Sequence, residues 1–196
     1  MRRLILVRHA APMKRPDVPA RDWPLSPAGQ ADAARLAELL APYAPAAIIT
    51  SDELKARQTA QPLADRLGLP LAVAPGLHEH ERRSADYLDD ATFQATMARL
   101  FAEPDTLVFG EETANQALAR FSQAVGDALA LRPSGDLAIF THGTVLSLFV
   151  AAHSDHDPMR FWYHLHLPAW VIFTLPDFTL LEAQMRLPNP SDQPEA

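Results

Sequence analysis

The 196-residue chain contains no cysteine. This absence excludes disulfides, thiolate nucleophiles, and zinc or iron–sulfur centres held by cysteine. Long apolar stretches are missing as well: nothing approaches the run of about 18 apolar residues that a membrane span needs, and the N-terminus lacks the apolar region of a signal peptide. We therefore expect a cytoplasmic protein that contacts no membrane.

Basic residues are outnumbered by acidic ones. The 17 lysines and arginines against 24 aspartates and glutamates give a formal net charge of −7. A chain of this balance is a poor match for the phosphate backbone of nucleic acids, so we expect no nucleic-acid partner.

Hydrophobic residues make up 48% of the sequence, which is enough for one sizeable core. We predict a single domain over residues 1–187 with a small insert at about 75–110. Residues 188–196 are polar and proline-rich, so we expect a disordered tail there.

Short apolar runs alternate with segments of helical periodicity. Strands are expected at 4–7, 46–50, 69–74 and 137–140. One helix is expected to begin at Ser26-Pro27 and a second to end at Gly68. Three more are expected over 90–102, along the apolar stripe from Ala114 to Leu129, and from Thr144 to about Ala152. A hairpin over 169–175 and 178–186 would close the sheet. The pattern predicts an α/β fold, a three-layer α/β/α sandwich with a mostly parallel, mixed central sheet.

Polar side chains follow several of these strands. Arg8 and His9 come directly after the first strand, and His142 with Gly143 follows the strand at 137–140. Arg57 lies about two turns into the helix after Thr50. Because the carboxyl ends of parallel strands share one edge of a sheet, these groups could converge. Two arginines and two histidines, with no acidic metal cluster, predict a site for a phosphate-sized anion and no metal.

Five short motifs occur in an order typical of one family. They are Arg8-His9-Ala10, the helix start Ser51-x-x-Leu54-x-x-Arg57-Gln58-Thr59-Ala60, Leu77-His78-Glu79, Gly110-Glu111-Glu112 with Arg120, and Thr141-His142-Gly143. The ordered set, over roughly residues 3–175, resembles the histidine phosphatase superfamily, which includes the cofactor-dependent phosphoglycerate mutases.

The resemblance implies a role for each matching residue. His9 would be the nucleophile that accepts the phosphoryl group, and Glu79 would protonate the leaving oxygen and then activate water. The phosphoryl oxygens would be bound by Arg8, Arg57 and His142, with help from the backbone N–H of Gly143. Two arginines can stabilise the charge that a metal stabilises elsewhere, so we expect no metal and no cofactor.

Two departures from the family pattern concern the site. Ala10 stands where a glycine is more usual, and the segment after Glu79 lacks the usual glycines, which leaves Glu81 as a rival for the acid. We favour Glu79 because it holds the Leu-x-Glu position. Since the leaving alkoxide needs a proton, we expect this carboxyl group to be partly protonated near neutral pH.

The predicted function is hydrolysis of phosphate monoesters through a covalent phosphohistidine. One alternative is a phosphoglycerate mutase-type phosphotransferase, although only about thirty residues separate Glu79 from Gly110, where mutases of this family carry a longer insertion. Another is a non-catalytic module that binds phosphorylated ligands. A small phosphorylated substrate would be read by the loops at 10–25 and 78–110, whose candidate contacts are Lys14, Arg15, Arg21, Trp23, Arg82 and Arg83. The sequence is compatible with a homodimer but does not decide the oligomeric state. Arg120, on the helix that begins near Ala114, is interpreted as a structural residue.

Overall fold

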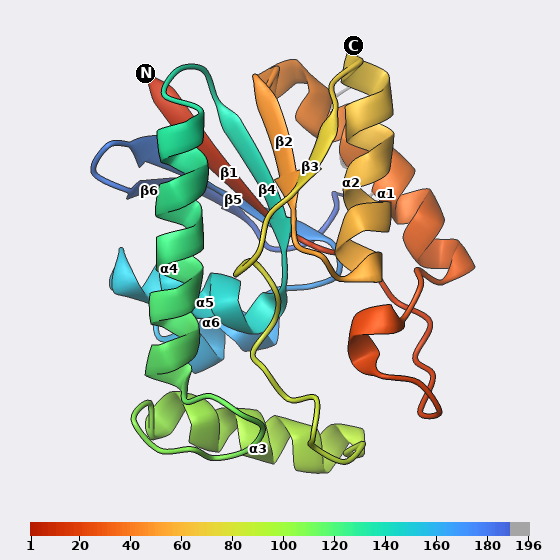
Figure 1. Ribbon diagram of the computed structural model, residues 1–196, viewed down its shortest axis with the longest axis vertical. Coiled ribbons are helices and arrows are strands. Elements are labelled where there is room, and N and C mark those ends of the chain that lie inside the picture. Colours follow the sequence, from red (N-terminus) through yellow and green to blue (C-terminus); the bar gives the residue numbers. More distant parts are fainter. Residues whose placement is uncertain (189–196) are drawn as a thin grey trace.

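The computed structural model describes residues 1–188, in which six strands form one mixed sheet (Figure 1). The strands are β1 (Arg2–Arg8), β2 (Ala47–Thr50), β3 (Leu71–Val73), β4 (Leu137–Thr141), β5 (Ala169–Leu175) and β6 (Thr179–Gln184). Their order across the sheet is β3-β2-β4-β1-β5-β6. The first four strands in this order are mutually parallel, and β5 runs antiparallel to both of its neighbours. The predicted mixed, mostly parallel sheet is confirmed.

Alternate residues of β1 face opposite sides of the sheet, as the twofold period of a strand requires. Leu4 and Leu6 pack with one apolar cluster, and Ile5 and Val7 with the other; all four are fully buried. A strand buried on both faces reads as a continuous apolar run, which is why the sequence signal here was strong.

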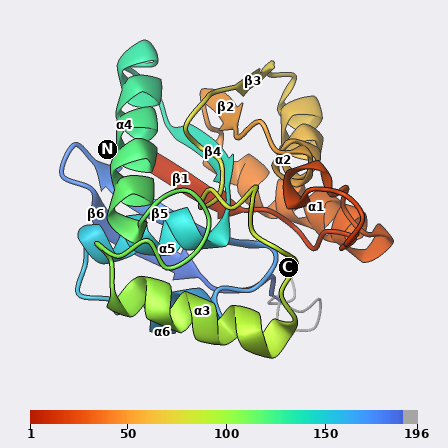
Figure 2. The same cartoon turned by 60° about the horizontal axis from the view of Figure 1, so that its bottom comes forward.

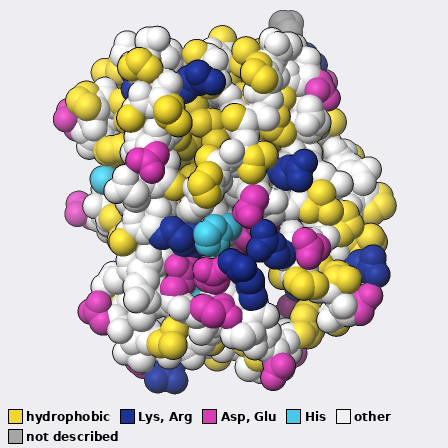
Figure 3. Space-filling view, in the orientation of Figure 1, with side chains coloured by type: hydrophobic (Ala, Val, Ile, Leu, Met, Phe, Trp, Pro, Cys, Tyr) yellow, Lys and Arg dark blue, Asp and Glu magenta, His cyan; other side chains and the backbone are white. Residues whose placement is uncertain are grey.

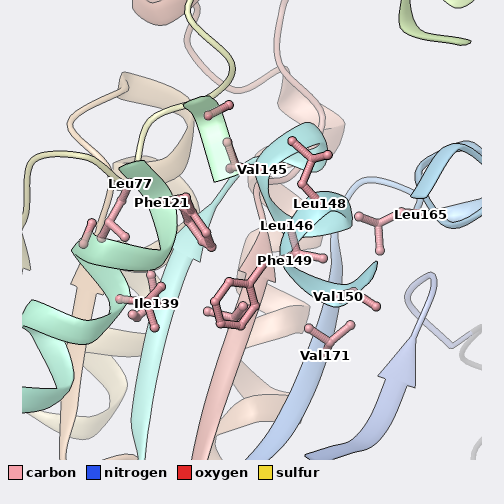
Figure 4. Close-up of a cluster of buried hydrophobic side chains, with 14 of the residues drawn as sticks. Leu77, Phe121, Ile139, Val145, Leu146, Leu148, Phe149, Val150, Leu165 and Val171 are labelled. Carbon is pink, nitrogen blue, oxygen red and sulfur yellow. The ribbon is translucent and has the colours of Figure 1, made fainter. Parts of the chain in front are cut away.

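Helices cover both faces and complete the three layers. They are α1 (Pro27–Leu40), α2 (Leu54–Leu67), α3 (Asp90–Ala102), α4 (Ala114–Leu131), α5 (Gly143–Ala152) and α6 (Pro158–His164), with short 3-10 turns η1 (Ala20–Asp22) and η2 (Ala41–Tyr43). The helices α1 and α2 pack on one face and α4 and α5 on the other, where α6 lies against α5, while α3 contacts α6 and crosses below the end of the sheet (Figures 1 and 2). In Figure 4 the apolar side chains of α5 lie against the sheet, with Phe149 and Val150 near Ile139 and Val171. The α/β/α sandwich is therefore confirmed.

The carboxyl ends of three adjacent strands are aligned by their register. Arg8 of β1 pairs with Thr141 of β4, and Thr50 of β2 pairs with Phe140. Two backbone hydrogen bonds extend the ladder past the strands, from His9 N–H to the Thr141 carbonyl and from Ser51 N–H to the Phe140 carbonyl, both 3.0 Å. In Figure 1 these ends lie in the lower half of the molecule, above α3. The residues that follow the three strands are thus brought to one edge.

Some boundaries differ from the sequence-based expectation. The strand expected at 69–74 shortens to β3, and α6 was not predicted, although Asp157 caps it and Pro158 occupies its first turn, a usual pattern for a helix start. The expected disordered tail falls, apart from Pro188, outside the described residues. No helix within residues 1–188 is both long and apolar enough to cross a membrane.

Candidate functional site

His9 follows β1 directly and is almost fully buried, with 7% of its surface exposed. Its Nδ1 lies 2.8 Å from the carbonyl oxygen of Ala10. A carbonyl oxygen can only accept, so Nδ1 carries the proton and Nε2 keeps its lone pair. Burial, followed by the neighbouring His142 and Lys55, whose protonated forms repel a second positive charge, lowers the pKa of His9 well below its ordinary value. The ring is therefore neutral at physiological pH and has the ionisation state of a nucleophile.

The guanidinium of Arg8 lies against the start of α5. A Cβ atom on Gly143 would come within 2.8 Å of the guanidinium carbon, so only glycine leaves the room that Arg8 occupies. Nη1 donates to the carbonyl of Leu165, and the buried Nε has no partner among the described residues. Burial lowers the pKa of Arg8 to about 10, which leaves the group charged at neutral pH.

His142 caps the start of α5 and is fully buried beside His9, with the two ring centroids 5.2 Å apart. Its Nε2 lies 2.8 Å from the Ser51 hydroxyl and 3.6 Å from Oε1 of Glu53. Burial lowers the pKa of His142 to about 4, and the nearby Glu53 carboxylate offsets only part of that effect. The free protein therefore holds two neutral histidines side by side.

The carboxylate of Glu79 is docked on the first turn of α5. It accepts hydrogen bonds from the backbone N–H groups of His80 (2.8 Å), Thr144 (3.1 Å) and Val145 (3.3 Å). The N-terminus of a helix favours negative charge because its N–H groups are unpaired and its dipole is positive there. Burial alone would raise the pKa of Glu79, but the positive charge of Arg82, that of His142 in its protonated form below about pH 4, and these N–H donors lower it to about 2.

The pKa of Glu79 corrects our expectation of a carboxyl group partly protonated near neutral pH. That expectation considered what the reaction needs and not the donors that α5 supplies. The structure does place Glu79 beside the histidines and Arg8, whereas its rival Glu81 forms an ion pair with the exposed Arg83. Of the two carboxylates, only Glu79 shares the electrostatic environment of His142 and Arg8.

Arg120 holds the backbone on which Glu79 is carried. Its guanidinium, projecting from α4, donates to the carbonyls of Gly76 (2.7 Å), His78 (3.0 Å) and Glu79 (3.1 Å). The same guanidinium is paired with the Glu112 carboxylate at 2.5 Å. This contact set agrees with a structural role for Arg120 and explains how a loop residue such as Glu79 can be fixed in place.

The structure does not bring Arg57 to this cluster. Its side chain is exposed, and no described residue forms a hydrogen bond or ion pair with it. Residues two positions apart on an α-helix point about 200° away from each other. Thr59, two residues further along α2, accepts a hydrogen bond from the Ala10 N–H, so the face of α2 that meets the His9 loop is not the face of Arg57.

Lys55 occupies the position on α2 that Arg57 was expected to fill. It lies one turn before Thr59, is 5% exposed, and its charge lowers the pKa of both His9 and His142. Sequence reasoning missed it because arginine is the better match for a phosphoryl group. The sequence did contain a signal: Lys55 and Thr59 are four residues apart, and residues at this spacing lie on the same face of a helix.

A buried ion pair joins Lys55 to Glu53. The Nζ of Lys55 donates to the Glu53 carboxylate and, at 2.8 Å, to the carbonyl of Ala20 in the loop that follows β1. The other oxygen of Glu53 accepts from the Glu79 N–H at 3.0 Å. Burial alone would raise the pKa of Glu53, but the charges of His142 and Lys55 lower it, so the carboxylate is ionised. Glu53 thereby connects Lys55, His142 and Glu79.

Unpaired polar atoms concentrate around these residues. Within residues 1–188, seven buried side-chain nitrogen or oxygen atoms lack a hydrogen-bond partner, and six of them belong to Arg8, His78, His80, Arg82, His142 and Thr144. Buried polar groups are normally paired, so such a concentration marks a place that binds a polar ligand. Figure 3 shows basic, acidic and histidine side chains gathered near the middle of one face, where the segment after β3 passes between α4 and α2. Among the same residues no three His, Asp or Glu side chains are arranged to hold a metal ion.

This α/β protein thus has a buried, neutral histidine surrounded by arginine, lysine and unpaired polar atoms, an arrangement suited to binding an anion. The sequence profile of the histidine phosphatase superfamily (branch 1) matches residues 4–177. The chain belongs to that superfamily.

Solved structures share the fold. Mycobacterial glucosyl-3-phosphoglycerate phosphatase in complex with inorganic phosphate is 25% identical, with a TM-score of 0.70 over 89% of this chain and 90% of its own. YhfR of Bacillus stearothermophilus is 22% identical, with a TM-score of 0.75 over 94% and 96%. Phosphoserine phosphatase of Entamoeba histolytica is 14% identical, with a TM-score of 0.75 over 94% and 97%. No curated protein matches the chain in a sequence search.

The ionised state of Glu79 has a measurable consequence for stability. Because the folded pKa of about 2 lies below the ordinary value of 4.5, the group stabilises the fold above pH 4.5, and this contribution is lost as the pH falls towards 2. The full effect is on the order of 3 kcal/mol, and roughly 2 kcal/mol of it would be lost between pH 6 and pH 3. Urea unfolding at these two pH values should therefore show a smaller loss of stability for Glu79→Gln than for the wild type.

Glu81→Gln is the matched control for this measurement, since Glu81 lies two residues away and pairs with an exposed arginine. It should keep the wild-type pH dependence. An unchanged pH dependence in Glu79→Gln would contradict the ionised, helix-docked carboxylate.

Proposed function

We propose that this protein is a phosphatase that hydrolyses phosphate monoesters through a phosphohistidine at His9 and needs no metal ion. The observation that carries the proposal is the state of His9: buried, neutral, and with Nδ1 committed to Ala10 so that Nε2 is left for attack. Membership of the superfamily and the presence of phosphatases among the structures of the same fold support it.

Cations and donors around His9 would hold the transferring group. The guanidinium of Arg8, the ammonium of Lys55 and His142 lie around His9, and the backbone N–H of Gly143 would add a donor. Phosphoryl transfer depends mainly on positioning and on stabilising charge spread over three oxygens, which such groups supply. In the first step Nε2 bonds to phosphorus, the ester P–O bond breaks, and its electron pair stays on the leaving oxygen.

The proton for that oxygen must come from somewhere other than the resting carboxylate, because the pKa of Glu79 is about 2. A phosphate monoester has a second pKa of about 6, so its monoanion carries one proton into the site. Glu79 would pass this proton to the leaving oxygen. In the second step Glu79 takes a proton from water, the oxygen of that water bonds to phosphorus, the N–P bond breaks, and inorganic phosphate leaves.

Replacement of His9 tests the proposal directly. Hydrolysis of an aryl phosphate should persist in EDTA and fall at least about a thousandfold in His9→Ala, since the nucleophile is lost. Brief incubation with labelled substrate followed by acid or base treatment should show an acid-labile, base-stable label on the wild type alone. Full activity of His9→Ala would overturn the mechanism. Isomerised product without free phosphate would indicate a mutase, and phosphopeptide binding without turnover would indicate a binding module.

Lys55 and Arg57 offer a matched pair on one helix. We expect Lys55→Met to lower kcat/KM about a hundredfold, because a charge at the phosphoryl group is lost, and Arg57→Met to change it less than about threefold. Lys55→Arg should restore much of the activity, which separates the loss of charge from the loss of packing around Glu53. A loss in Arg57→Met as large as that in Lys55→Met would return the phosphate-binding role to Arg57.

The pH profile of kcat/KM provides a separate check, since it reports ionisations of the free enzyme and the free substrate. The pKa of His9 and that of Glu79 are both lowered, so activity should not decline as the pH falls from 7 to 5. Above about pH 6 it should fall roughly tenfold per unit as the substrate loses its proton. For a second substrate whose phosphate pKa is one unit lower, this decline in kcat/KM should begin about one pH unit lower. Activity that rises with pH through 6.5 would instead show a histidine that titrates normally.

A further inference from the structure

Arg82 stands out in the segment after Glu79 because its charge has no partner. No described residue forms a hydrogen bond or ion pair with its guanidinium, and Nη1 is buried without a partner. Basic residues nearby are paired with carboxylates: Arg83 with Glu81, Arg120 with Glu112, and Lys55 with Glu53. A half-buried cation of this kind has a desolvation cost that no hydrogen bond or ion pair within residues 1–188 offsets.

Aromatic rings hold the guanidinium of Arg82 in position. Its central carbon lies 5.1 Å from the ring centroid of Phe93 on α3 and 5.9 Å from that of Phe109. These two rings pack edge to face, 6.4 Å apart, so they form a corner in which the guanidinium rests. Stacking of this kind restrains the planar group while its N–H donors stay available at the edge.

The backbone on both sides of Arg82 is fixed by the turn at 110–112. The Glu112 carboxylate accepts from the Glu81 N–H at 2.8 Å, and the Glu111 carboxylate accepts from the N–H groups of Arg83 (2.9 Å) and Ser84 (2.6 Å). Gly110 has a φ of +74°, and a Cβ there would come within 2.2 Å of the Glu81 carbonyl oxygen. The chain around Arg82 is thus built to a defined geometry, as preorganised binding residues are.

The positive charge of Arg82 affects the pKa values of the residues around His9. It lowers the pKa of Glu79 more than any other charge does, and it also acts on Arg8 and His142. Glu79 is the group that would face the leaving oxygen, and Arg82 follows it by only three residues. Arg82 and Glu79 therefore belong to the same segment, which would face the leaving group in the proposed reaction.

Resting on the proposed phosphatase function, we propose that Arg82 determines specificity by binding a second anionic group, a carboxylate or a phosphate, on the leaving-group part of the substrate. A guanidinium edge pairs with either anion through two parallel hydrogen bonds. The substrate class is then phosphate monoesters that carry another negative charge near the ester, and simple alkyl phosphates are poorer substrates.

Matched substrates test this assignment. Racemic 3-phosphoglycerate and racemic glycerol 3-phosphate differ only in that the first has a carboxylate where the second has a hydroxymethyl group. Fructose 1,6-bisphosphate and fructose 6-phosphate form a second pair, which tests a phosphate as the second anion. The wild type should prefer the doubly anionic member of at least one pair by about tenfold or more in kcat/KM. Arg82→Gln should abolish that preference, mainly through KM, because it should lose more activity on the doubly anionic member of the pair than on the singly anionic one. Arg82→Lys should keep part of the preference.

Arg83→Gln is the control, because Arg83 is adjacent, exposed and paired with Glu81. It should leave the preference intact. Equal losses on both members of each pair in Arg82→Gln would show that Arg82 binds the transferred phosphoryl group, and the absence of any preference in the wild type would also overturn the assignment. Either result leaves phosphatase activity in place, whereas a wild type that hydrolyses none of the four substrates, nor the aryl phosphate, would overturn the proposed function itself.

Discussion

Six ionisable side chains share a poorly solvated space at the carboxyl edge of the sheet, and the cost of burying charge sets which of them are ionised. His9 and His142 lose their protons because water is excluded and cations lie close by. Glu79 stays ionised because the positive charge of Arg82 lies close by and the first turn of α5 supplies backbone donors, and Lys55 is accompanied by Glu53. The same site thus holds a neutral histidine and an ionised carboxylate close together, the states that the proposed nucleophile and base require.

This arrangement depends on contacts that lie outside the reacting groups. The guanidinium of Arg8 can lie against α5 only because residue 143 is a glycine. Arg120 and Glu112 fix the loop that bears Glu79, and the neighbouring turn fixes the loop that bears Arg82. A site built on loops becomes precise in this way, since each loop is tied by charged side chains to a helix or to another turn.

The chemistry of the site is divided along the chain. Residues after β1, β2 and β4 lie around His9, and in the proposed reaction these segments would supply the groups for the phosphoryl oxygens. The segment between β3 and α4 carries Glu79 and Arg82, which would face the leaving group in the same proposal. Such a division lets one fold keep a common reaction while its loops set the substrate, as is usual for α/β proteins.

The sequence by itself determined the layered α/β fold, because runs such as Leu4–Val7 are apolar on both faces and leave little choice of partner. It also placed His9, Arg8 and His142 at one edge, since strand ends in a parallel sheet must share it. Only the tertiary structure decided that Lys55 and not Arg57 faces His9, because that depends on the rotation of α2 against the loop through Thr59. Only the tertiary structure set the charge of Glu79 as well: its donors come from α5, more than sixty residues away along the chain.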